Sequence, residues 1–219
     1  MLLQVLQKLA ESQIRYPTAE EAAVFAARIE KFSSGAVINV IAMMDGWLVE
    51  TERPGDDATQ RANFNGKDRR HGKKNLAVFL PDGTIADCIL NKPGATHDAS
   101  LASSLNLETR MRHLPPEYAV AGDTAFATSP RVVRPLSRSE QPTDLRALSE
   151  ILGQMAALSG VRVAAEWGIG TITKVWRILH VPLPADDGNG VRETLEICCR
   201  LTNFRARTMK VSQLLNTYF

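Results

Sequence analysis

The chain has 219 residues, of which 44% are hydrophobic and 23% are charged, as in a single globular domain with a buried core. No stretch approaches the roughly 18 consecutive apolar residues of a membrane span, and the first residues lack the basic region and the cleavage site of a signal peptide. The three cysteines form neither a disulfide framework nor a zinc-binding spacing. We therefore expect a protein of a reducing compartment, the cytosol or the nucleus, that is not secreted and does not enter a membrane.

The net charge of +2 is too small to indicate a nucleic-acid partner, but the basic residues are unevenly distributed. They gather within residues 61–74 and again within 200–210. Such clusters suit a phosphate backbone that lies across one face of the protein. Each cluster taken alone is equally compatible with a solvated loop.

Residues 1–34 are predicted to form a helical leader ahead of a domain over 35–219. Apolar residues recur at helical spacing from Leu2 to Leu9, and Pro17 ends this first helix. Thr18 and Glu21 then form a capping-box pattern, which indicates the start of a second helix.

Three predicted elements each present one acid beside an apolar run. They are a strand over 36–46 that ends at Asp45, a strand within 118–126 that delivers Asp123, and a helix over 161–179 that carries Glu166. Gly46 is expected to begin a turn directly after the first strand. Each acid alone also has an ordinary interpretation, because most Asp-Gly pairs form turns and most single glutamates on helices face solvent.

The other elements are predicted from turn signals and from the period of the apolar residues. Before Asp123 they are a second strand over 48–53, a polar and basic stretch over 56–74 with a turn at Asn65-Gly66, a hairpin of 75–80 and 84–90, and a loop over 91–98. After it come an irregular connection over 128–142 with a short strand at 132–133, two helices that meet between Leu158 and Val161, a loop over 182–190 and a last helix around Leu195. Gly168 and Gly170 are unusual inside a helix, and we expect them to let a substrate backbone or a neighbouring strand approach closely. This order predicts a mixed α/β sheet covered by helices, with ligand sites at strand ends.

Three carboxylates gathered at such a site suit the cleavage of phosphodiesters. That reaction needs an activated water and compensation for the charge on the leaving oxygen, and two divalent cations roughly 3.5–4 Å apart supply both. Mg²⁺ prefers oxygen ligands, so carboxylates are suitable ligands for it. A short side chain on a central strand, such as that of Asp45, suits the ligand that bridges both ions, and Glu166 on a flanking helix can adjust as the phosphate moves.

Eight short motifs follow one another along the chain. They are Met44-Asp45-Gly46, Asn65-Gly66 before a basic segment, Phe79-Leu80-Pro81-Asp82-Gly83, Asn91-Lys92-Pro93-Gly94 with His97-Asp98, Gly122-Asp123-Thr124-Ala125-Phe126, Ala165-Glu166-Trp167-Gly168, Arg177-Ile178-Leu179 with Pro182-Leu183-Pro184, and Arg200-Leu201-Thr202-Asn203-Phe204. In this order they resemble the DDE superfamily endonuclease domain of PIF/Harbinger-type transposases. The resemblance covers residues 35–218 and implies a ribonuclease H-like fold.

The resemblance also implies a metal-dependent DNA endonuclease or transposase catalytic domain. It places the catalytic and metal-binding acids at Asp45, Asp123 and Glu166, and it implies two divalent ions, Mg²⁺ or Mn²⁺. His97 matches a family motif and is expected to be a hydrogen-bonded structural histidine. Asp98 either supports the metal ligands or caps a helix, and the cap is the favoured interpretation.

The expected partner is DNA, held by basic residues near the acids. The candidate DNA contacts are Lys67, Arg69, Lys73, Lys74, Arg162 and Lys174. Transposases of this family usually carry an N-terminal helix-turn-helix region, for which the segment before Asp45 is too short. Target recognition is therefore expected either to need a separate Myb-like partner, as the resemblance implies, or to be lost. The resemblance places the protein in the nucleus, or in the cytoplasm before import, and leaves a homodimer open.

Two rival functions remain. One is a recruited DNA- or protein-binding module that has lost catalysis. The other is a metallohydrolase that acts on small phosphoesters, whose site would be a closed pocket, whereas a nuclease needs an open basic groove.

Overall fold

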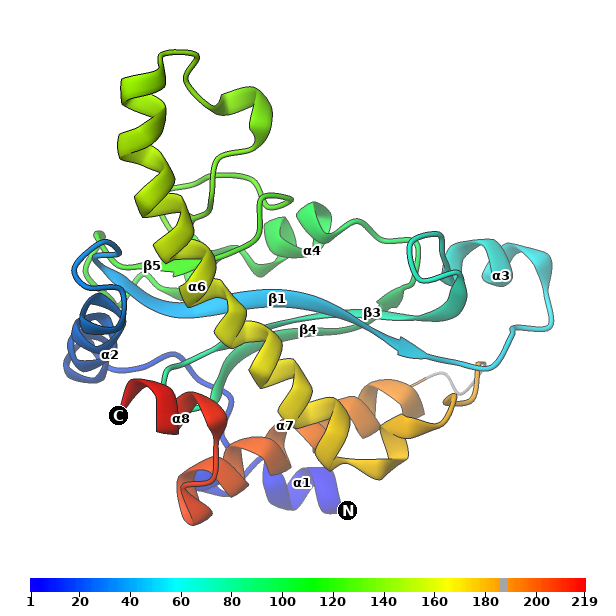
Figure 1. Cartoon of the computed structure of the whole chain (residues 1–219). Coiled ribbons are helices and arrows are strands. Elements are labelled where there is room, and N and C mark those ends of the chain that lie inside the picture. Colours follow the sequence, from blue (N-terminus) through cyan, green and yellow to red (C-terminus); the bar gives the residue numbers. More distant parts are fainter. Residues whose placement is uncertain (186–188) are drawn as a thin grey trace.

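The computed structural model describes residues 1–185 and 189–219 (Figure 1). Its strands are β1 Val40–Glu50, β2 Phe64–Asn65, β3 Arg70–Phe79, β4 Ile85–Pro93, β5 Ala119–Ala121 and β6 Val132–Val133. Its α-helices are α1 Leu2–Leu6, α2 Ala19–Phe32, α3 Asp57–Asn63, α4 Asp98–Leu105, α5 Leu107–Arg110, α6 Leu145–Val175, α7 Gly190–Met209 and α8 Gln213–Tyr218. Short 3₁₀ helices lie at Ala10–Ser12, Arg138–Glu140 and Arg177–His180. The protein is therefore a mixed α/β protein, as predicted.

The described strands form one mixed sheet centred on β1 and β3. β1 pairs antiparallel with β3, and β3 pairs antiparallel with β4 and, at its start, with β2. On its other edge, β1 pairs with β5 in parallel, and β5 pairs in parallel with β6. β5 is so short that its register with β1 ends at Met43. Beyond Met43, no strand of the described residues pairs with this edge of β1, and Leu183 bonds to it only near Glu50.

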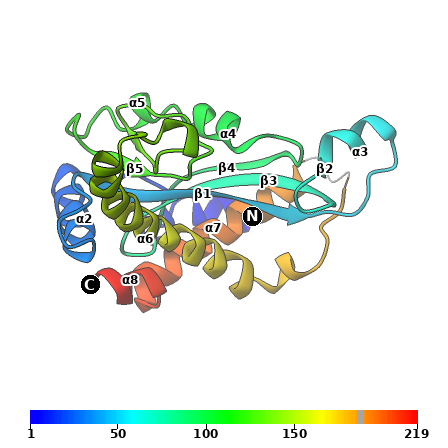
Figure 2. The same ribbon diagram turned by 45° about the horizontal axis from the view of Figure 1, so that its top comes forward.

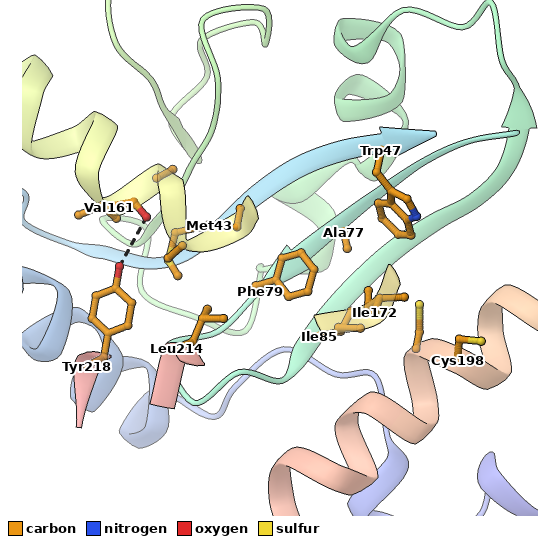
Figure 3. Close-up of a cluster of buried hydrophobic side chains, with 14 of the residues drawn as sticks. Met43, Trp47, Ala77, Phe79, Ile85, Val161, Ile172, Cys198, Leu214 and Tyr218 are labelled. Atoms are coloured by element: carbon orange, nitrogen blue, oxygen red, sulfur yellow. Dashed lines mark hydrogen bonds between the residues drawn. The ribbon is translucent and has the colours of Figure 1, made fainter. Parts of the chain in front are cut away.

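Helices cover both faces of the sheet (Figure 2). One apolar cluster joins the sheet to α6, α7 and α8 and contains Phe79 and Leu195. The other joins the opposite face to α2, α4 and α5 and contains Met44 and Leu101. Figure 3 shows the first cluster, in which Phe79 lies at the centre of the labelled side chains. From Ala42 onward, the apolar side chains of β1 alternate between the two clusters, as the period of a strand requires.

The structure corrects three predicted elements. β1 does not stop at a turn but continues through Gly46 to Glu50, so the predicted strands over 36–46 and 48–53 are one strand. The two helices predicted to meet between Leu158 and Val161 are the single helix α6. It continues through Gly160 because Leu158 and Val161 are both buried on the same face, which offsets the roughly 1 kcal/mol that a glycine costs in a helix. Within 56–74, the helix α3 was not predicted.

The leader and the connection after α6 also have defined places. The capping box of Thr18 and Glu21 is present at the start of α2, and α2 packs against β1. The loop predicted over 182–190 includes residues 186–188, which lie outside the described residues; before them, Leu183 bridges to Thr51 after β1. Within the described ranges, no helix combines the length and apolarity needed to cross a bilayer.

Candidate active site

The registers of two parallel strands bring Asp45 and Asp123 together. Met43 of β1 is paired with Ala121 of β5, and each acid lies two residues further along its own strand direction. Met43 and Ala121 both belong to the cluster beneath α6. Because side chains two residues apart on a strand share a face, Asp45 lies on the α6 side of the sheet.

The turn after β5 holds Asp123 at this edge. Phe126 is buried and its backbone N–H donates to the carbonyl of Asp123 at 3.0 Å. The ring packs so closely on Gly122 that a Cβ there would lie 2.5 Å from Phe126 Cδ2 and 2.9 Å from Met44 Cε. The backbone N–H of Thr124 donates to Asp123 Oδ1 at 2.7 Å. The Gly122–Phe126 motif is therefore a packed turn that orients one carboxylate.

Glu166 reaches the same region from α6, which crosses β1 (Figure 1). The buried residues Ala164, Ala165 and Gly168 face the sheet, so α6 lies close to the strands. The Glu166 side chain itself is 52% exposed. One turn earlier on the same helix, Arg162 Nη2 lies 3.1 Å from Glu166 Oε1, and Arg162 Nη1 lies 3.8 Å from Asp45 Oδ2.

All three predicted acids line one pocket of about 370 Å³. Its lining residues are Asp45, Gly46, Trp47, Leu48, Lys67, Asp68, Lys74, Asp98, Asp123, Arg162 and Glu166. The lining holds five carboxylates and three cationic side chains. The lining of this pocket is therefore more acidic than basic.

The environment of Asp45 disfavours its charged form. Burial raises the pKa of Asp45, and the nearby charges of Asp123 and Glu166 raise it further. A hydrogen bond from the Gly46 N–H at 2.8 Å and the charge of Arg162 oppose this shift. The net pKa of Asp45 lies above its ordinary value, mainly because the carboxylate is buried. A cation placed between these acids would relieve their repulsion.

Asp98 does not cap the helix α4, which was the favoured interpretation of this residue. It is the first residue of α4, and the helix is preceded by His97 without a side-chain cap, so the prediction of a cap is wrong. Asp98 Oδ1 instead lies 3.0 Å from Lys74 Nζ, and the Lys74 side chain is only 10% exposed. A Cβ on Gly46 would lie 2.7 Å from Asp98 Oδ1. Gly46 is therefore a glycine of close approach inside β1 and not a turn residue.

The basic residues predicted to contact DNA divide into three groups. Lys67 lines the pocket and is held there by the turn at Asn65, whose side chain accepts from the Lys67 and Asp68 N–H groups and donates to the Gly94 carbonyl. Lys74 and Arg162 also line the pocket, but both are engaged in ion pairs with its acids.

Asp68, which was not predicted, lines the pocket as well, and only its position beside Lys67 could have indicated it.

The remaining predicted residues lie outside the pocket lining. Arg69 is exposed and has a positive φ of 55°. Lys73 donates to Asn63 Oδ1 at 3.2 Å, and Lys174 is exposed two turns beyond Glu166 on α6. His97 is exposed, and its ring makes no hydrogen bond with the described part of the chain, so the prediction of a hydrogen-bonded structural histidine is wrong.

The donor set fits hard divalent cations, because all of the acids offer carboxylate oxygens. Among the described residues, however, no three Asp, Glu, His or Cys side chains are grouped closely enough to hold an ion. Binding an ion between Asp45 and Glu166 therefore requires these side chains to move. Glu166 has the freedom to do so, since about half of its side chain is exposed.

A mixed sheet that brings together one acid from within a strand, one acid from just after a neighbouring parallel strand and a third acid from a covering helix is suited to metal-assisted phosphate chemistry. Residues 44–203, more than half of the chain, match the model of the DDE superfamily endonuclease family, and the chain belongs to this family. Its mixed sheet and flanking helices agree with the ribonuclease H-like fold of DDE domains. Searches of curated proteins and of solved structures found no match.

Proposed function

We propose that this protein is a metal-dependent DNA endonuclease, the catalytic domain of a PIF/Harbinger-type transposase or of a nuclease derived from one. The observation that carries the proposal is that Asp45, Asp123 and Glu166 of a DDE endonuclease family member line one pocket. They reach it from β1, from the turn after β5 and from α6, three separate parts of the fold. The bond that is cut is a phosphodiester of DNA.

In the proposed reaction, Asp45, Asp123 and Glu166 would hold two Mg²⁺ or Mn²⁺ ions, with Asp45 as the central ligand and Asp123 and Glu166 completing the ligand set. When bound, the ions supply an activated water and compensate the charge on the leaving oxygen. The residues themselves fix the geometry: Asp45 and Asp123 sit on backbone held by the sheet and by Phe126, and Glu166 adjusts from the helix. Rigid placement of this kind is what lowers the barrier in phosphoryl chemistry.

The charge of the pocket supports a requirement for metal. Five carboxylates against three cations would repel a phosphodiester. Two divalent ions would reverse this sign, so DNA would be attracted only to the loaded site. Lys67 is our first candidate for a phosphate contact, because it lines the pocket and forms no ion pair within the described residues. Arg69, Lys73, Lys74, Arg162 and Lys174 are proposed as further contacts.

The experiment is nicking of supercoiled plasmid by the purified protein with Mg²⁺ or Mn²⁺. Asp45→Asn and Glu166→Gln preserve shape and remove charge, so we expect both to abolish nicking. The matched control is Glu30→Gln, because Glu30 on α2 is exposed and its side chain makes no contact with the described pocket. Nicking that survives in both site variants would refute the proposal.

A different outcome would favour the recruited binding module. If no sample nicks but the wild-type protein retards DNA on a gel, and Lys67→Ala weakens that binding equally for all sequences, the fold binds without cutting.

We also propose a nuclear location and a separate Myb-like partner for target recognition, both on the resemblance to PIF/Harbinger transposases. A homodimer would be detected by sedimentation of the purified chain.

A further inference from the structure

The guanidinium of Arg162 lies between two of the proposed metal ligands. Its Nη2 is 3.1 Å from Glu166 Oε1 and its Nη1 is 3.8 Å from Asp45 Oδ2. The two acids come from different elements, β1 and α6, so this single cation links the helix to the strand. The side chains of Arg162 and Asp45 are each only 21% exposed, which limits the screening of this contact by solvent.

The other cations of the pocket do not share this position. Lys74 is paired with Asp98 on the opposite side of β1, where Gly46 leaves room for that carboxylate. Lys67 lines the pocket but forms no ion pair with the acids in the described part of the chain. Of these three cations, Arg162 is therefore the one that contacts Asp45 Oδ2 and Glu166 Oε1, carboxylate oxygens that a metal ion would use.

A carboxylate that forms an ion pair with a guanidinium is less available to a metal ion. A guanidinium is always protonated at neutral pH, so it cannot release the carboxylates by losing a proton. It can only move, and it lies on a long side chain with exposed neighbours on α6. A divalent ion attracts each carboxylate twice as strongly as a single positive charge at the same distance.

We propose that Arg162 is a built-in competitor of the metal ions: its guanidinium binds Asp45 and Glu166, and a divalent cation must displace it to occupy the site. This inference rests on the proposed function. It gives Arg162 a defined role that differs from the direct DNA contact expected from the sequence. It also accounts for the spacing of the acids, which are held by Arg162 and not gathered around one point.

The test measures binding of Mn²⁺ to the full chain without DNA, by calorimetry and by the electron paramagnetic resonance signal of the free ion. Arg162→Gln removes the charge and keeps hydrogen-bonding groups. We expect it to bind Mn²⁺ roughly threefold to tenfold more tightly than the wild-type protein, the range that corresponds to losing one or two partly exposed ion pairs. Arg162→Lys keeps the charge without the planar fork, and we expect an intermediate affinity.

The matched control is Lys67→Gln, which removes one positive charge from the same pocket without removing a contact to Asp45 or Glu166. We expect it to change Mn²⁺ affinity less than Arg162→Gln does. Circular dichroism of every variant establishes that it is folded before the titration.

The outcomes separate this inference from the function on which it rests. If the wild-type protein binds Mn²⁺ and Arg162→Gln binds it equally or more weakly, direct competition is refuted and the nuclease proposal stands. An equal gain in Lys67→Gln would likewise refute direct competition, because the effect would be one of overall charge. If neither the wild-type protein nor Arg162→Gln binds Mn²⁺, both proposals fail.

Discussion

Two glycines of α6 that lie just beyond Glu166 have opposite surroundings. A Cβ on Gly168 would lie 2.6 Å from Phe79 Cε1 and 2.7 Å from Phe79 Cγ, and Phe79 is fully buried at the centre of the cluster in Figure 3. A Cβ on Gly170 would meet no atom within 4 Å. We therefore predict that Gly168→Ala destabilises the protein and that Gly170→Ala stabilises it.

The magnitudes follow from two opposing effects. Alanine improves a helix interior by up to about 1 kcal/mol over glycine, and this gain applies to both positions. Overpacking a buried site costs about 1–3 kcal/mol, and this cost applies to Gly168 alone. Because the helix term cancels between the two variants, their stabilities should differ by about 1–3 kcal/mol. For a chain of this size, that difference corresponds to melting temperatures about 2–12 °C apart.

Thermal unfolding followed by circular dichroism measures this difference, and urea unfolding provides a second value. The collision with Phe79 would also push α6 away from β3, so Gly168→Ala should weaken Mn²⁺ binding through a displaced Glu166, whereas Gly170→Ala should not. Melting temperatures that shift equally and in the same direction for both variants would show that α6 does not rest on Phe79 as described.

Three further predictions concern single side chains. Burial raises the pKa of Asp45, so the folded state holds this proton more tightly than the unfolded state does. The stability of the wild-type protein should therefore fall as the pH rises from below 3.8 through the raised pKa. In urea unfolding, Asp45→Asn should be more stable than the wild-type protein at pH 7, and this advantage should vanish below pH 3.8. The hydrogen bonds from Arg15 lower the pKa of Glu21 to about 2, so the charged form of Glu21 stabilises the folded protein. In the same assay, Glu21→Gln should be less stable than the wild-type protein above pH 4.5, and this difference should disappear as the pH falls through about 2. Asn203→Ala should lower the free energy of unfolding by at least about 2 kcal/mol, measured from the urea midpoint, because buried Asn203 bonds both the N–H and the carbonyl of Ile85.

The acids could be located from the sequence because local pattern controls where a strand or a helix presents a side chain. The apolar run before Asp45 predicted a strand, and the run before Asp123 predicted another, and the structure has both. The glycines were harder, because a glycine serves a turn and a close approach equally well. Gly46 was expected to form a turn and instead admits Asp98, while the close approach expected at both Gly168 and Gly170 is confirmed only at Gly168.

The ion pairs of the pocket could not be predicted, because they depend on how whole elements lie against one another. Spacing alone relates Arg162 to Glu166, four residues apart on one helix. It does not relate Arg162 to Asp45, which is more than a hundred residues away on β1. That contact exists because α6 lies close over the sheet, and α6 lies close because Gly168 places no side chain between the helix and Phe79. A residue without charge or polar side chain thus sets the distance between the charges, so the electrostatics of this site follow from its packing.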